Sequence, residues 1–174
     1  MSKTIQTARL KLRRVHADDA ADIARLIAEW DVIRWLTTPP WPYRVEDAVD
    51  FTATMASDTT MAITHDGQFM GVVDISQRGK AEDAELGYWL GLPFHGNGYM
   101  TEAATALISD HFAKGHTGLY SGYVVGNTAS CNVLTKLGFA ETGPRRAVSR
   151  PLAREVDINQ MTLTAERWRD RHAT

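Results

Sequence analysis

Apolar and polar residues alternate along several stretches of the chain, with the period of two that is typical of a half-buried β-strand. Over residues 8–15, apolar Leu10 and Leu12 alternate with basic Lys11 and Arg13, which predicts a strand that opens a sheet. The other stretches that predict strands are residues 60–65, 68–76, 84–90, 119–125 and 156–163.

Other stretches carry apolar residues three or four positions apart, which is the spacing of one helix face. Residues 23–30 have large apolar side chains at this spacing, after two aspartates whose charges suit a helix N-terminus. Residues 100–112 repeat the pattern and lead to Lys114-Gly115, a cation and a glycine that favour a helix C-terminus. Shorter helices are expected at residues 45–57 and 129–137.

The predicted elements follow the order β-α-α-β-β-β-α-β-α-β-β within one domain, residues 1–174. Asp66-Gly67 suits the tight turn of a hairpin, so the middle strands form an antiparallel series. One strand-helix-strand crossover follows near residue 98. This order predicts an α/β fold of the α+β kind, with a mixed sheet and helices on both of its faces.

The composition is that of an ordinary globular protein and excludes several classes of function. A hydrophobic content of 44%, a charged content of 23% and a net charge of −2 leave no basic stripe for nucleic acid. Residues 1–6 lack the apolar stretch of a signal peptide, and no apolar run reaches about 18 residues, so we expect a cytoplasmic protein outside the membrane. With Cys131 as the only cysteine and no metal-ligand spacing among six histidines, we expect neither a disulfide nor a metal site.

A glycine turn is the feature that points most directly to chemistry. The strand over residues 84–90 leads to His95-Gly96-Asn97-Gly98, and a helix follows. Glycine lets the backbone approach a ligand closely, and a helix N-terminus offers unpaired N–H groups to a phosphate. A tight turn without a ligand explains the pattern equally well. No Gly-Lys-Ser/Thr follows, so a P-loop is excluded, and the preceding antiparallel series does not match a dinucleotide-binding fold.

Five segments resemble, in order and spacing, the GNAT N-acetyltransferase superfamily, and more closely its RimJ/RimL-like branch. The segments are T-A-R-L-K-L-R at 7–13, E-L-G-Y-W-L at 85–90, H-G-N-G-Y-M-T-E-A at 95–103, N-T-A-S at 127–130 and K-L-G-F at 136–139. The resemblance spans nearly the whole chain and implies the acyl-CoA N-acyltransferase fold. One departure is Pro93, where the family usually has Gln or Arg three residues before the first glycine.

The resemblance implies acetyl-CoA as a co-substrate, without a metal. Backbone amides of residues 96–101 bind the pyrophosphate, the main chain of residues 89–92 pairs with the pantetheine arm, and Asn127 holds that arm from the other side. The residues so implied for the cofactor are Trp89, Leu90, Leu92, His95, Gly96, Asn97, Gly98, Tyr99, Met100, Thr101, Asn127, Ser130 and Lys136.

Acetyl transfer to an amine needs a neutral nucleophile, donors for the oxyanion and an acid for the leaving thiolate. The resemblance suggests Ser130 as general acid or hydrogen-bond donor to the sulfur, and a helix-cap serine is the alternative. Many relatives use a tyrosine where this chain has Leu134. Glu85 is placed to accept the ammonium proton, directly or through water, and a salt-bridged strand glutamate is the alternative. Because Cys131 fits a buried apolar residue better than a nucleophile, we expect direct transfer in a ternary complex.

The acceptor side is expected at the proline loop. Trp35, Trp41 and Tyr43 are candidate substrate-binding residues there, with core packing as the alternative for Trp35. The expected acceptor is a primary amine, either a protein N-terminus or a small molecule. The alternative function is a non-catalytic acyl-CoA-binding protein that acts as a sensor or scaffold. The resemblance also implies that subunits can pair as a homodimer.

Overall fold

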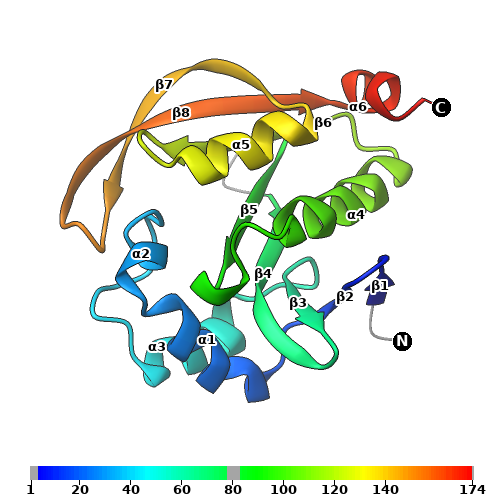
Figure 1. Cartoon of the computed structure of the whole chain (residues 1–174). Helices are drawn as coiled ribbons and strands as arrows, with labels where there is room; N and C mark the ends of the chain where they lie inside the picture. The colour runs from blue at the N-terminus through cyan, green and yellow to red at the C-terminus, as the bar shows by residue number, and fades with distance from the viewer. Residues whose placement is uncertain (1–3, 78–82, 174) are drawn as a thin grey trace.

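The alternating stretches form strands, as predicted, in the computed structural model, which describes residues 4–77 and 83–173. The described residues form a sheet of eight strands in the order β1-β2-β3-β4-β5-β6-β8-β7 (Figure 1). Neighbouring strands are antiparallel except for β5 and β6, which are parallel. The strands are β1 (Thr4–Gln6), β2 (Lys11–Arg14), β3 (Met61–His65), β4 (Gln68–Ser76), β5 (Ala84–Leu90), β6 (Gly118–Val124), β7 (Ala140–Ser149) and β8 (Arg154–Thr164).

The helical spacing likewise produces helices near the predicted places. They are α1 (Ala20–Ile27), α2 (Trp30–Ile33), α3 (Val45–Asp50), α4 (Tyr99–Ala113), α5 (Thr128–Leu137) and α6 (Ala165–His172), with short turns η1 (Ala17–Asp19), η2 (Phe51–Met55) and η3 (Leu92–Phe94). In the described part of the chain, no helix has both the length and the apolar character that a membrane crossing requires.

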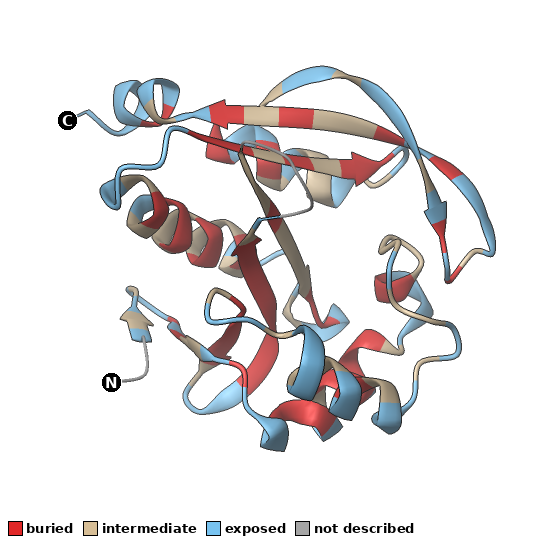
Figure 2. Cartoon of the chain, turned by 180° about the vertical axis from the view of Figure 1, so that it is seen from behind, coloured by how far each residue is buried: buried red, intermediate tan, exposed pale blue. Residues whose placement is uncertain are grey.

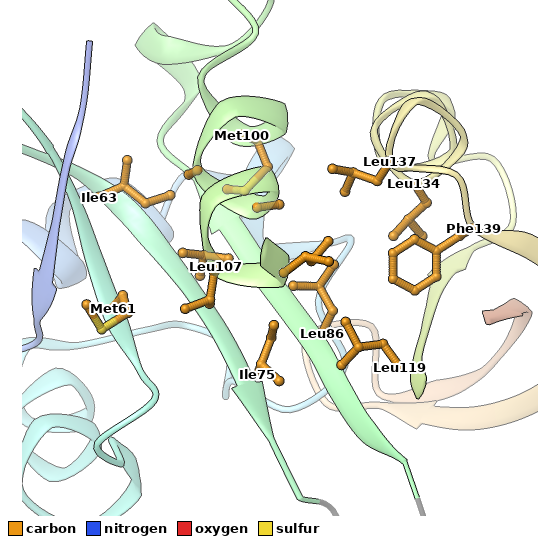
Figure 3. Packing of buried hydrophobic residues seen from close by; sticks show 14 of the residues in the cluster. Met61, Ile63, Ile75, Leu86, Met100, Leu107, Leu119, Leu134, Leu137 and Phe139 are labelled. Atoms are coloured by element: carbon orange, nitrogen blue, oxygen red, sulfur yellow. The ribbon is translucent and has the colours of Figure 1, made fainter. Parts of the chain in front are cut away.

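The two faces of the sheet pack into separate apolar clusters, because successive side chains of a strand point in opposite directions. Met61 and Ile63 of β3 belong to the cluster that includes Leu86 and, from α4, Leu107 (Figure 3). Ala62, which lies between them, belongs to the cluster beneath α1. Figure 2 shows this burial as red bands on the strands and on the inner sides of the helices. Helices therefore cover both faces of the mixed sheet, as the element order predicted.

The parallel pair β5 and β6 separates soon after it begins. Its register contains only Ala84 with Leu119 and Glu85 with Tyr120. Beyond these pairs, Ser121 donates from its side chain to the carbonyl oxygen of Leu86 at 2.8 Å. Because the register ends after Glu85 and Tyr120, the carboxyl-terminal halves of the two strands diverge, and we call this divergence the splay. Helices α4 and α5 begin at its open end.

No stretch was predicted for β7, and the helix expected at residues 45–57 is α3 followed by η2. The structure differs from the predicted elements in three further places. The first predicted strand is two strands, β1 and β2, because the Thr7 amide donates to the Leu10 carbonyl at 2.9 Å and closes a turn between them. Trp30 does not extend the first helix; it begins α2 and is 40% exposed. Helix α6 was not predicted, because Trp168 is its one buried residue and no apolar period results.

Candidate functional site

The glycine turn after β5 leaves backbone amides without acceptors. Gly96 and Gly98 have φ of +77° and +75°, a left-handed conformation that costs other residues about 1–2 kcal/mol. Gly98 is the N-cap of α4 and has no side chain to cap it. The Glu102 amide, which donates to the Gly98 carbonyl at 3.0 Å, is the first to bond within the helix, so the amides of residues 99–101 lack a helical acceptor. Together with the helix dipole, these amides suit a phosphate.

Side chains of the turn hold its shape rather than point to a ligand. His95 Nε2 donates to the Leu90 carbonyl at 2.7 Å and ties the turn to the end of β5. Asn97 Nδ2 donates to the His95 carbonyl at 2.9 Å. The His95 ring thus bonds the backbone, and its implied role in binding the cofactor stays a prediction.

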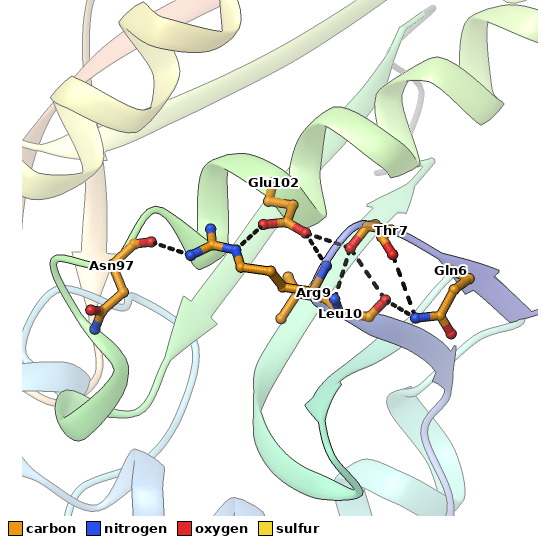
Figure 4. A network of polar contacts seen from close by, with 6 residues as sticks. All are labelled: Gln6, Thr7, Arg9, Leu10, Asn97 and Glu102. Carbon is orange, nitrogen blue, oxygen red and sulfur yellow. Dashed lines mark hydrogen bonds and ion pairs between the residues drawn. The ribbon is translucent and has the colours of Figure 1, made fainter.

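The segment before β2 braces the turn and the first helical turn of α4 (Figure 4). Arg9 Nε pairs with Glu102 Oε2 at 2.7 Å, and the Arg9 amide and the Thr7 hydroxyl donate to Glu102 Oε1 at 2.9 and 2.6 Å. Arg9 Nη1 also donates to the Asn97 carbonyl at 3.0 Å, and the guanidinium lies 4.6 Å from the centroid of the Tyr99 ring. We call this set of contacts the brace.

The brace fixes the charge beside the turn. Burial raises the pKa of Glu102, but hydrogen bonds from Thr7 and Arg9 and the charge of Arg9 outweigh it, so the pKa lies below its usual 4.5. Glu102 is therefore ionised, and Arg9 neutralises it next to the anion-binding amides. No role for Arg9 could be predicted from the sequence, because its partner Glu102 lies 93 positions away.

A groove of about 540 Å³ adjoins the start of α4. Lys136 of α5 lies in its lining together with Gly98 of the turn, so a cation faces the same space as the helix N-terminus. The lining residues are Gln6, Thr7, Gly98, Thr101, Glu102, Thr105, Ala106 and Lys136. The groove therefore joins several of the residues implied for the cofactor.

Asn127 and Ser130 lie at the open end of the splay, where α5 begins. The Asn127 side chain is the N-cap of α5 and accepts from the Ser130 amide at 3.2 Å. Ser130 Oγ lies 2.8 Å from the hydroxyl of Tyr88, which β5 carries across the splay. The alternative interpretation of Ser130 as the helix cap is wrong, because Asn127 fills that position.

The sequence analysis missed Tyr88 as a site residue. Alternation along β5 was the available signal, because Leu86, Tyr88 and Leu90 share the face that packs under α4 and α5. Burial raises the pKa of the Tyr88 phenol above its ordinary value, and the hydrogen bond with Ser130 offsets this only in part. The Tyr88 phenol thus keeps its proton, and either hydroxyl can donate in the bond with Ser130.

Glu85 lies at the closed end of the splay. It stands opposite Ser76 of β4 and Tyr120 of β6 and is half-buried. Three positions separate it from Tyr88, so the two side chains point to opposite faces of the sheet. Its role as the base stays a prediction.

The aromatic residues of the proline loop lie in different environments. Trp35 is half-buried and packs against the cluster around Val124. Its ring lies 3.7 Å from the position that a Cβ on Gly126 would occupy, beside the start of α5. Trp41 is 43% exposed, and its ring lies 5.0 Å from that of Trp30. A substrate-binding role therefore stays a prediction for each.

Tyr43 packs against the cluster beneath α1. Burial, followed by the charges of Asp47 and Asp50, raises the pKa of Tyr43 to about 12. The phenol is therefore neutral at physiological pH, and Tyr43 lies deeper than Trp41.

The remaining residues implied for the cofactor come from β5 and the turn. The Trp89 ring lies 6.1 Å from that of Phe69, on the α1 side of the sheet, so the main chain of β5 is what faces the splay. Leu92 is 42% exposed, whereas Met100 is buried in the cluster beneath α4. The positions of Leu92 and Met100 are both compatible with the expectation that backbone atoms make most of the contacts with the cofactor.

The described residues contain no group of three or more histidine, cysteine or acidic residues able to hold a metal ion. Cys131 is half-buried and packs against the main cluster, which fits a small apolar residue.

Comparisons with known proteins show a family and a fold. The family model described as an acetyltransferase (GNAT) domain matches residues 9–140. No curated protein matches the sequence. A GNAT-family acetyltransferase from Bacillus anthracis has a similar structure, with a TM-score of 0.83 at 18% identity over 94% of this chain and 99% of that one.

Two further solved structures contain coenzyme A species. RimJ of Mycobacterium smegmatis, in complex with CoA-disulfide, gives a TM-score of 0.75 at 24% identity over 95% of this chain and 87% of that one. The microcin C7 self-immunity acetyltransferase MccE, in complex with acetyl-CoA and AMP, gives a TM-score of 0.77 at 22% identity over 91% of this chain and 93% of that one. At these identities the likeness is one of fold.

Proposed function

The chain belongs to the GNAT acetyltransferase family, and from that premise we propose that it transfers the acetyl group of acetyl-CoA to a primary amine. The observation that carries the proposal is the splay of β5 and β6, with the N-termini of α4 and α5 at its open end. Ligands of open α/β sheets bind outside the carboxyl ends of parallel strands, and this is such a place.

The described residues fit acetyl-CoA along its length. The amides of residues 99–101 and the left-handed Gly98 suit its pyrophosphate, and Lys136 suits a phosphate in the adjoining groove. Beyond Glu85, β5 has no ladder partner in β6, so its main chain is available to the amide groups of the pantetheine arm. Acetyl-CoA supplies an activated thioester when bound.

The chain's own residues account for the remaining needs of the reaction. Ser130 donates a hydrogen bond toward the sulfur, and Glu85 or a water molecule accepts a proton from the substrate ammonium, which leaves a neutral amine to attack. Trp35, Trp41 and Tyr43 form the acceptor side. The amine attacks directly in a ternary complex, because half-buried Cys131 packs as an apolar residue.

The acceptor is either a protein N-terminal amine or a small-molecule amine. Incubation with acetyl-CoA and a panel of short peptides, polyamines and aminoglycosides, followed by free-thiol release, tests the proposal. We expect release that depends on one amine class, with initial-rate lines that intersect as a ternary complex requires. Saturable acetyl-CoA binding without release by any amine contradicts the proposal and favours the sensor or scaffold.

A further inference from the structure

Tyr88 and Ser130 form the hydrogen bond that bridges the splay between β5 and α5. The Tyr88 hydroxyl lies 2.8 Å from Ser130 Oγ and 3.4 Å from the Ser130 carbonyl oxygen. Bonds between hydroxyl and oxygen have lengths of about 2.5–3.0 Å, so the serine hydroxyl is the partner within range.

Either hydroxyl can donate in this bond, because each carries one proton and lone pairs. A bound thioester sulfur gives the proton of Ser130 a second acceptor, whereas the buried Tyr88 phenol has Ser130 Oγ as its nearest acceptor. We therefore take Tyr88 as the donor when the cofactor is bound. With a lone pair of Ser130 occupied by Tyr88, the proton of Ser130 is left for another acceptor.

We infer that Tyr88 is a positioning residue for Ser130, whose hydroxyl proton it directs toward the sulfur of the departing thiolate. This inference rests on the proposed function. Donation by Tyr88 also polarises the serine hydroxyl and strengthens it as a donor, as in other hydrogen-bond chains.

The group-transfer step balances without a proton leaving Tyr88. The amine nitrogen forms the C–N bond, the C–S bond breaks, and its electron pair goes to sulfur. The substrate ammonium gives one proton to the base before attack, the nitrogen gives a second to solvent as the amide forms, and the sulfur takes a proton from solvent after release. Ser130 stabilises the charge on sulfur by hydrogen bonding alone, which suits a hydroxyl that is a weaker acid than a thiol.

The test compares Tyr88→Phe, Ser130→Ala and the double variant in thiol-release kinetics. Loss of an oriented donor costs about tenfold or more in kcat, and we expect this for both single variants with the KM for acetyl-CoA within about twofold. The double variant should match Ser130→Ala, because Tyr88 has nothing left to position.

Tyr123→Phe is the matched control. Tyr123 lies on the neighbouring strand β6, in the same apolar cluster as Tyr88, and its hydroxyl contacts Glu141 and Asn159 at 2.9 and 3.0 Å. We expect this variant to lose stability, measured by thermal unfolding, but to keep the wild-type kcat.

Several outcomes overturn the inference. A Tyr88→Phe variant with the wild-type kcat, beside a slowed Ser130→Ala, leaves the proposed function intact and removes Tyr88 from it. If the kcat losses of the two single variants multiply in the double variant, Tyr88 acts independently of Ser130. Equal losses in Tyr88→Phe and Tyr123→Phe mean a structural effect. A wild-type protein that releases no thiol overturns the proposed function together with the inference.

Discussion

Arg9 shows how one side chain couples charge and shape at the glycine turn. Its guanidinium pairs with Glu102 and holds the Asn97 carbonyl. Arg9→Met leaves the Glu102 charge uncompensated beside the pyrophosphate site, so we expect the Kd for acetyl-CoA, measured by calorimetry, to rise about tenfold. The double variant with Glu102→Gln should recover part of the loss, because the repelling charge is gone. An unchanged Kd in Arg9→Met contradicts this account of the brace.

Glu85 offers a second test at the residue scale. If its carboxylate accepts the ammonium proton, Glu85→Gln removes the proton acceptor but keeps the size of the side chain. We expect kcat, measured by thiol release, to fall about a hundredfold. A kcat equal to that of the wild type excludes Glu85 and leaves water as the base.

Patterns that lie within one turn of chain could be interpreted from the sequence, whereas contacts with distant partners could not. The glycine turn before a helix was expected at Gly98, but Asn127 was implied only by the family resemblance, and its place as the N-cap of α5 was not predicted. Tyr88 and Arg9 bond partners 42 and 93 positions away, so their roles appear only when the strands and helices are assembled.

Helix α4 has a left-handed glycine at each end, and only one adjoins the proposed site. Gly98 and Gly115 have φ of +75° and +89°, so alanine at either costs about 1–2 kcal/mol of stability. Gly98→Ala should also weaken acetyl-CoA binding severalfold by moving the amides, whereas Gly115→Ala should not. Thermal unfolding and calorimetry of both variants measure the two effects. Equal binding by both variants means that the turn is structural.

Most strands and the long helix α4 were predictable from their apolar period, whereas β7 was not, because its burial does not alternate from residue to residue. The boundary between β1 and β2 was not predictable either, since a Thr7 hydrogen bond sets it. Helix α6, with Trp168 as its one buried residue, has no period to detect. The splay itself has no signal in the sequence, because the length over which two strands pair depends on the packing of both.

At the scale of the molecule, a buried ion pair joins β2 to the first helical layer. Arg13 contacts both carboxylate oxygens of Asp19 at 2.7 and 2.8 Å, and the His16 amide adds a third bond at 2.8 Å. Burial raises the pKa of Asp19, but these bonds outweigh it, so the folded pKa lies below its usual 3.8. The pair therefore stabilises the fold above about pH 4, and the effect is lost as pH falls through the folded pKa.

Asp19→Asn tests this linkage. The variant should unfold with about 2–3 kcal/mol less free energy at neutral pH, because Arg13 is left partly buried without its partner. Denaturant unfolding should show the gap to the wild type closing below about pH 4. A gap that stays constant with pH contradicts the role given to the charge.

The central claim is that the splay and the glycine turn together hold acetyl-CoA. The most direct test is a calorimetric titration of the wild-type protein with acetyl-CoA and, separately, with S-acetyl-pantetheine, which lacks the pyrophosphate. We predict saturable binding of one acetyl-CoA per chain, and binding of the truncated thioester weaker by about tenfold or more, because the amides of the turn lose their anion. Equal affinity for the two compounds, or no saturable binding of acetyl-CoA, contradicts the claim.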